Sequence, residues 1–136
     1  MTIENPVAYL NGIWDWKIFE GCFGITKIKP TDIDGLVERH GFFLVFEAKQ
    51  LNVPVKAGQE IMFNALINTK KFTVFVLWGE QNKPEEMQIF YSSIAIANYI
   101  GWGFDKKKAT LEDVRRAVKL WFSYVDTHYF IGMKNE

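Results

Sequence analysis

The sequence offers few residues for thiol or histidine chemistry and no excess of charge of either sign. Its 136 residues include one cysteine, Cys22, which excludes an intrachain disulfide framework and leaves too few thiols for a zinc knuckle. The two histidines, His40 and His128, lie far apart in the chain, so a paired-histidine zinc motif is absent. Basic and acidic residues number 16 each, which excludes a histone-like basic binder and an acidic disordered tail. Zero net charge still leaves room for a locally basic groove.

Long apolar runs are also missing. The longest nearly uncharged stretch, residues 87–104, is interrupted by Gln88, Asn98 and two glycines, so it is a poor membrane span. The first residues lack the basic and apolar segments of a signal peptide, so we expect none. Hydrophobic residues make up 49% of the chain and aromatic residues 16%, enough for a core without cross-links. We therefore expect one reduced, cytoplasmic domain over residues 1–136.

Apolar spacing predicts helices that alternate with strands. A capping box at Thr110 and Asp113 marks the start of the last helix. The wholly apolar run at residues 72–78 is typical of a strand covered on both faces. The expected elements are a helix at 6–20, strands at 33–37 and 42–48 joined as a hairpin, a helix at 57–68, strands at 72–78 and 87–93 separated by a polar turn at 80–86, and a helix from 111 to about 126. This order predicts an α/β fold, a mixed central sheet with helices packed on it.

The expected hairpin brings charged residues together. If residues 40–41 form a two-residue turn, residues whose numbers add up to 81 face each other; a four-residue loop gives the same register. Asp34 then lies opposite Glu47, and Asp32 lies opposite Lys49. Because side chains alternate along a strand, all four emerge on one face of the hairpin. Directly opposed side chains have Cβ atoms roughly 4.5–5.5 Å apart.

Two carboxylates at this spacing repel each other unless a cation lies between them or one of them is protonated. Carboxylate oxygens select hard cations such as Mg²⁺ or Mn²⁺, and a nearby ammonium group stabilises charge on a phosphate. Asp34, Glu47 and Lys49 together therefore indicate metal-assisted hydrolysis of a phosphodiester. The alternative is structural: Asp32 pairs with Lys49, and Glu47 is solvated at the end of the sheet.

The same residues resemble a known family. Residues 30–35 read Pro-Thr-Asp-Ile-Asp-Gly, and residues 47–49, thirteen positions after the second aspartate, read Glu-Ala-Lys. This pattern resembles the PD-(D/E)XK nuclease superfamily, which includes type II restriction enzymes, Holliday-junction resolvases and RecB-type nucleases. The resemblance covers residues from about 14 to 80. It implies a restriction-endonuclease-like core, here in the order α-β-β-α-β-β-α.

The resemblance also implies roles for individual residues. Asp34 and Glu47 would bind Mg²⁺ or Mn²⁺, with the Ala48 carbonyl as a third ligand, and Lys49 would be the catalytic lysine. Asp32 is a second candidate for the aspartate, and the expected register favours Asp34 because it faces Glu47.

Two accessory positions match motifs of the superfamily. Glu20, near the end of the first expected helix, is similar to a helical glutamate that reaches the metal. Gln59 resembles the glutamine of the RecB-like pattern Gln-x-x-x-Tyr, although Phe63 stands in the place of the tyrosine. A solvated glutamate and an ordinary polar residue in a first helical turn are the structural alternatives.

Several basic residues are candidates for contacts with nucleic acid, because phosphates require cationic partners. The alternative is that they are simply solvated. The candidates are Lys70, Lys71, Lys106, Lys107, Lys108, Arg115 and Arg116.

These observations lead us to expect a small Mg²⁺- or Mn²⁺-dependent nuclease of phage or mobile-element type. Its expected substrate is DNA, including branched or structured DNA. One active site per chain suggests a homodimer where both strands of a duplex are cut. Two other hypotheses stay open: a catalytically silent module of the same fold that binds nucleic acid or a host protein complex, and an enzyme that uses the same metal site on a nucleotide.

Overall fold

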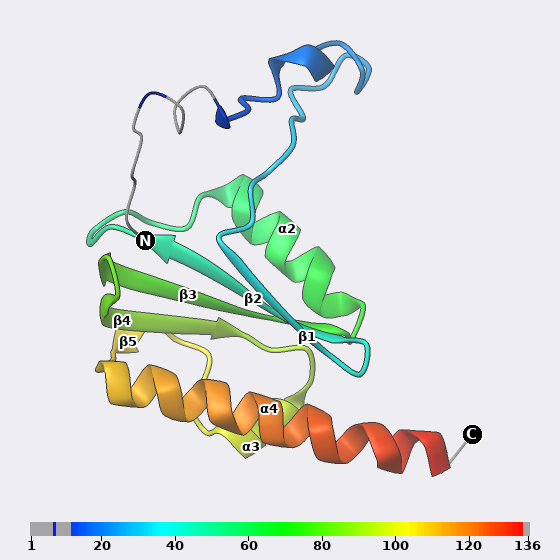
Figure 1. Ribbon diagram of the computed structural model, residues 1–136, viewed down its shortest axis with the longest axis vertical. Coiled ribbons are helices and arrows are strands. Elements are labelled where there is room, and N and C mark those ends of the chain that lie inside the picture. The colour runs from blue at the N-terminus through cyan, green and yellow to red at the C-terminus, as the bar shows by residue number, and fades with distance from the viewer. Residues whose placement is uncertain (1–6, 8–11, 135–136) are drawn as a thin grey trace. The chain divides into compact units, whose positions relative to one another are not determined.

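The computed structural model describes residue 7 and residues 12–134, with side chains described as far as residue 127 (Figure 1). The chain divides into two units, Met1–Asp32 and Ile33–Glu136, which are described one at a time.

In the first unit, described residues 7 and 12 are helical, but the helix expected at 6–20 does not extend beyond residue 12. Residues 13–16 are not helical, and they are followed by a short 3-10 helix, η1 (Lys17–Phe19). Trp16 has a φ of 65°, in the left-handed region that a right-handed helix does not use. None of the residues of η1 is buried, so no apolar stripe packs against a core to hold a helix here. The prediction is therefore wrong for residues 13–20, and residues 6 and 8–11 of the expected helix lie outside the described residues.

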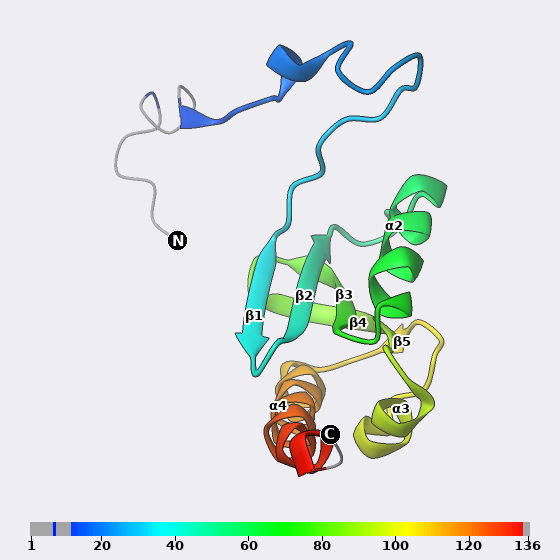
Figure 2. The same cartoon turned by 90° about the vertical axis from the view of Figure 1, so that its right-hand side faces the viewer.

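The second unit contains a five-stranded mixed sheet and three helices, which confirms the α/β prediction (Figures 1 and 2). The strands lie side by side in chain order, and β2 and β3 are parallel whereas the other neighbours are antiparallel. The elements are β1 (Gly35–Arg39), β2 (Phe42–Lys49), α2 (Ala57–Asn68), β3 (Phe72–Glu80), β4 (Lys83–Phe90), α3 (Ile94–Ile100), β5 (Lys107–Lys108) and α4 (Leu111–Lys134). The helix expected at 57–68 is confirmed with the same bounds.

The central strand β3 is buried on both faces, as its apolar sequence predicts. On one face α2 packs against the sheet, and on the other lie α3 and α4 (Figure 2). The core under α2 consists of Val45, Phe63, Val74, Val76 and Trp78. The core under α3 and α4 includes Leu44, Phe75, Met87, Ile89, Ile96 and Trp121.

The C-terminal half departs from the expected element order. The polar turn is shorter than 80–86, since β4 already begins at Lys83, and β4 pairs with the additional short strand β5. Helix α3 was not expected from the sequence. Ser93 caps it, because its Oγ accepts a hydrogen bond from Ile96 N at 3.2 Å, and Gly101 ends it with a φ of 76°.

Helix α4 begins as its capping box predicts. Thr110 Oγ1 accepts a hydrogen bond from Asp113 N at 3.1 Å, and Asp113 Oδ2 accepts one from Thr110 N at 2.9 Å. The helix continues to Lys134, beyond the expected end near residue 126.

The β1–β2 hairpin has the expected register. Gly35 pairs with Phe46 and Arg39 with Phe42, so the numbers of paired residues add up to 81 throughout. His40 and Gly41 have φ values of 53° and 82°, and two consecutive positive values suit a tight two-residue turn between twisted strands.

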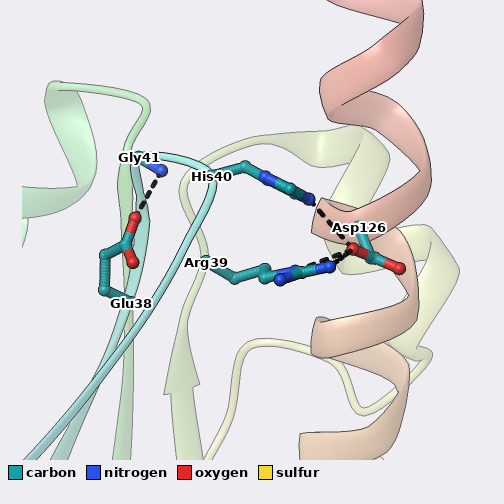
Figure 3. Close-up of polar contacts among 5 residues, drawn as sticks. All are labelled: Glu38, Arg39, His40, Gly41 and Asp126. Carbon is teal, nitrogen blue, oxygen red and sulfur yellow. Dashed lines mark hydrogen bonds and ion pairs between the residues drawn. The ribbon is translucent and has the colours of Figure 1, made fainter.

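The tip of the hairpin is attached to α4 through one carboxylate (Figure 3). Asp126 Oδ1 accepts hydrogen bonds from Arg39 Nε at 2.7 Å and lies 2.6 Å from the second guanidinium nitrogen of the same residue. His40 Nε2 lies 3.0 Å from the same oxygen. These hydrogen bonds, with the Arg39 guanidinium as the largest cause, lower the pKa of Asp126. The contact joins the first strands to the last helix of the second unit.

Replacing Asp126 with asparagine is expected to lower the melting temperature at neutral pH. Because the pKa of Asp126 is lower in the folded chain, its carboxylate stabilises the fold above its ordinary pKa, and this stabilisation disappears as the pH falls through the lowered value. Thermal unfolding between pH 7 and pH 2 should show the wild type and Asp126→Asn converging in acid. Asp105→Asn removes the same charge from a loop, and an equal effect of the two variants at neutral pH would contradict a specific contact.

Candidate active site

Asp34 and Glu47 meet at the open end of the β1–β2 hairpin. The ladder of paired residues ends at Gly35 and Phe46, which makes Asp34 and Glu47 the next two facing positions. Asp34 Oδ2 accepts a hydrogen bond from the backbone N–H of Ala48 at 2.8 Å, and this bond holds the aspartate beside β2. The confirmed register therefore brings the two carboxylates together, as the sequence predicts.

Glu47 and Lys49 project from β2 on the face that α2 covers, since side chains alternate along a strand and Val45 lies in the core under α2. Lys49 Nζ lies 3.8 Å from Glu47 Oε1. Gln59, in the first turn of α2, donates a hydrogen bond from Nε2 to the same oxygen at 3.1 Å. We call Asp34, Glu47, Lys49 and Gln59 the acidic corner.

Gln59 is fixed at both ends of its amide. Its Oε1 accepts a long hydrogen bond of 3.4 Å from the backbone N–H of Lys56, the residue that precedes α2. Its Nε2 binds Glu47, as described above. Gln59 therefore connects the start of α2 with the end of β2 and orients the Glu47 carboxylate.

Two side chains of the acidic corner are shielded from water, whereas Asp34 is exposed. The side chain of Lys49 is 8% exposed and that of Glu47 is 14% exposed. Burial, followed by the negative charge of Asp34, raises the pKa of Glu47, while the hydrogen bond from Gln59 and the charge of Lys49 act in the opposite direction. The net upward direction therefore reflects the burial of Glu47 first and the neighbouring charge of Asp34 second.

The oxygen atoms available at this corner include a main-chain carbonyl. In an antiparallel pair, the N–H and C=O of one residue are directed to the same neighbouring strand. The N–H of Ala48 is directed to Asp34, so the Ala48 carbonyl lies on that side of β2 as well. Within the described part of the chain, no three side chains of His, Cys, Asp or Glu form a cluster that could hold a metal ion. Two carboxylates and the Ala48 carbonyl are therefore the ligands that the acidic corner offers.

Two of the acidic residues singled out in the sequence belong to the first unit. Asp32 Oδ1 accepts a hydrogen bond from Trp16 Nε1 at 3.1 Å. Glu20 follows η1, so the expectation that it ends a long helix is wrong. Its role as a metal ligand stays a prediction.

The basic candidates lie at several places in the second unit. Lys70 and Lys71 directly precede β3, whereas Lys49 ends the parallel strand β2, so about 20 Å of strand separates them from the acidic corner. Arg115 and Arg116 are exposed on α4, which covers the opposite face of the sheet from Lys49.

Lys106 lies closer to the acidic corner. Its Nζ lies 4.2 Å from the centre of the Trp78 ring and 3.7 Å from Glu86 Oε2. Trp78 in β3 pairs with Lys49 of β2 on one side and with Glu86 of β4 on the other. The three residues therefore form one row across the sheet. The sequence did not reveal this row, because it depends on the parallel register of β2 and β3. Lys107 and Lys108 form β5, and Lys107 Nζ lies 4.6 Å from the centre of the Trp102 ring.

None of the helices in the described residues combines the length and apolar character needed to cross a membrane. Comparison of the chain with protein-family models, with curated proteins and with solved structures gives no match.

Proposed function

We propose that the chain is a small nuclease that hydrolyses phosphodiester bonds in DNA at the acidic corner. The observation that carries this proposal is the meeting of Asp34, Glu47 and Lys49 at one end of the sheet, where Glu47 and Lys49 are shielded from water. Facing carboxylates and a buried lysine each cost stability, and apolar residues of similar size would pack there more favourably. Their presence at one place is better explained by chemistry than by packing.

The corner fits a divalent cation such as Mg²⁺ or Mn²⁺. Asp34 and Glu47 occupy facing positions, and together with the Ala48 carbonyl they supply the oxygen ligands that these ions prefer. When bound, the ion would polarise the scissile phosphate and lower the pKa of a water molecule. Mg²⁺ retains several waters and is usually held by one or two carboxylates together with substrate phosphate, so a two-carboxylate site is sufficient.

The side chains around the carboxylates have separate tasks in this proposal. The Lys49 ammonium group offsets the negative charge that develops on the phosphate and orients the attacking water. Gln59 keeps the Glu47 carboxylate in place through its hydrogen bond to Oε1. The shielding of Lys49 strengthens its interaction with a phosphate, because water screens the charge less. A second copy of the chain would supply the second corner needed to cut both strands of a duplex.

Incubation of plasmid and junction DNA with Mn²⁺ tests the proposal. The wild type is expected to cleave, and Asp34→Ala and Lys49→Ala are each expected to reduce the rate about 10²- to 10⁴-fold, because each removes charge that acts on the reacting phosphate. Asp105→Ala serves as the control and is expected to retain the wild-type rate. Cleavage that survives both corner substitutions would refute the site.

Asp32→Ala in the same series decides between the two aspartates. Asp32→Ala is expected to cleave DNA at the wild-type rate. If instead Asp32→Ala lost cleavage and Asp34→Ala retained it, Asp32 would be the metal-binding aspartate. Calorimetry with Mn²⁺ separates the nuclease from a silent binding module: we expect heat of binding near neutral pH that disappears in Asp34→Ala. Absence of binding by the wild type would favour the silent module.

A further inference from the structure

A pocket of about 340 Å³ opens beside the acidic corner, where β2 and β3 end and the β3–β4 turn begins. Its lining includes Lys49 and Gln50 from the end of β2, Leu77 and Trp78 from β3, and Gln81 and Asn82 from the turn. Lys49 thus belongs both to the corner and to the wall of the pocket. This volume lies at the lower end of the range of roughly 300–1,000 Å³ that is typical of small-ligand sites.

The chemistry of the pocket suits a nucleobase. Leu77 and Pro84, both half-buried, provide apolar surface for the flat face of a base, whereas the edge of a base presents donors and acceptors. Gln50, Gln81 and Asn82 carry side-chain amides, each of which has both a donor and an acceptor, and all three residues are exposed. Side-chain amides of this kind recognise base edges in protein–nucleic acid complexes.

The position of the pocket determines which base can enter it. A phosphate at the acidic corner contacts Lys49, so the base attached to the neighbouring sugar lies within reach of the pocket that Lys49 also lines. In a continuous duplex this base is paired and stacked, and taking it out costs a few kcal/mol. An unpaired base, in a bulge, a flap or a single strand, enters at much lower cost.

From this geometry we infer that the pocket binds an unpaired nucleobase next to the scissile phosphate, which makes the substrate DNA with an unpaired nucleotide at the cleavage site. The inference rests on the proposed nuclease function and specifies its substrate class. The β3–β4 turn is then the part of the fold that selects the substrate, while the acidic corner performs the hydrolysis.

Cleavage of three DNAs of matched sequence tests the inference: a paired duplex, the same duplex with a one-nucleotide bulge, and the single strand. With Mn²⁺, the wild type is expected to cleave the bulged and single-stranded DNA about tenfold faster than the duplex. The double variant Gln81→Ala/Asn82→Gly should reduce this ratio to nearly one, because it slows cleavage of the bulged and single-stranded DNA. Glycine accepts the φ of 60° that Asn82 has in the turn, so this variant keeps the backbone conformation.

Asn52→Gly is the matched control, because Asn52 also has a positive φ, 68°, but does not line the pocket. It should retain the wild-type ratio. Equal rates on the three DNAs, or a ratio that the double variant leaves unchanged, would overturn the pocket assignment and leave the nuclease function intact. Faster cleavage of a matched bulged RNA would overturn the assignment to DNA.

A binding measurement separates this inference from the nuclease proposal. Fluorescence of 2-aminopurine placed at the bulge, measured with Ca²⁺ in place of Mn²⁺, reports whether the base enters a protein environment. We expect a change with the wild type that is lost in Gln81→Ala/Asn82→Gly. If no DNA is cleaved under any condition, the nuclease proposal fails, and the fluorescence change alone then supports or overturns the base pocket.

Discussion

Glu47→Gln is expected to abolish cleavage, by about 10³-fold or more, and at the same time to raise the melting temperature at neutral pH. The pKa of Glu47 is raised by burial and then by Asp34, so the folded chain disfavours the ionised form. Stability is therefore lost as the pH rises from the ordinary pKa of a glutamate through the raised value. Glutamine has the same shape and no charge, and it removes this cost above that pH range.

Thermal unfolding from pH 3 to pH 8 measures the effect. The variant should be more stable than the wild type at pH 7, and the two should converge below the ordinary pKa of glutamate. Mn²⁺ should raise the melting temperature of the wild type, because an ion that binds the folded chain stabilises it, and should have little effect on the variant. Glu60→Gln, at the next residue of α2 after Gln59, is the exposed control. A lower melting temperature of Glu47→Gln at pH 7 would show that the ionised Glu47 carboxylate does not destabilise the folded chain.

Gly79→Ala is expected to lower the melting temperature by about 10–20 °C, the largest effect on stability that we predict. Gly79 has a φ of 152° at a shift in register between β3 and β4, and an added Cβ would collide with the backbone carbonyl oxygen of Lys83. Backbone strain and overpacking each cost about 1–3 kcal/mol. The Lys83 carbonyl oxygen belongs to the backbone, so it cannot move aside as the end of a flexible side chain could. For a domain of this size, each kcal/mol corresponds to a few degrees.

Differential scanning calorimetry of Gly79→Ala beside Gly58→Ala measures this prediction. Gly58 lies in α2 with open space around its Cα, so alanine there should stabilise the chain by up to about 1 kcal/mol. Opposite signs for the two substitutions are the expected result. A shift of less than about 3 °C for Gly79→Ala would show that the turn moves away from β3 without cost.

The hairpin illustrates what the sequence could predict. Its turn residues fix a register, the register fixes which side chains share a face, and Asp34, Glu47 and Lys49 follow from local rules alone. The helix at 57–68 could also be predicted from the sequence, because residues with helical apolar spacing follow a loop that contains a proline. The presence of Gln59 in the acidic corner depends on both the hairpin and this helix, and the hydrogen bond from Gln59 to Glu47 links the two elements.

Other features depend on contacts between distant segments, which local patterns do not encode. The row from Lys49 through Trp78 to Glu86 requires the parallel register of β2 with β3, and Lys106 joins it from a loop after α3. The contact of Asp126 with the hairpin tip joins segments that are distant in the sequence: Arg39 lies 87 positions before Asp126, and His40 lies 86 positions before it. The second half of the helix expected at 6–20 is absent, because none of the residues of η1 is buried against a core.

The sequential order of the strands has a consequence for how the chain reaches this structure. Each strand of the sheet pairs with its neighbour in the sequence, so the contacts that define the sheet close comparatively short loops. Low contact order is associated with rapid folding, and we expect this unit to fold faster than β-sandwiches of similar size. The acidic corner draws on residues 34 to 59 alone. Its repelling carboxylates are therefore brought together by the most local part of the topology, where closing the chain costs the least entropy.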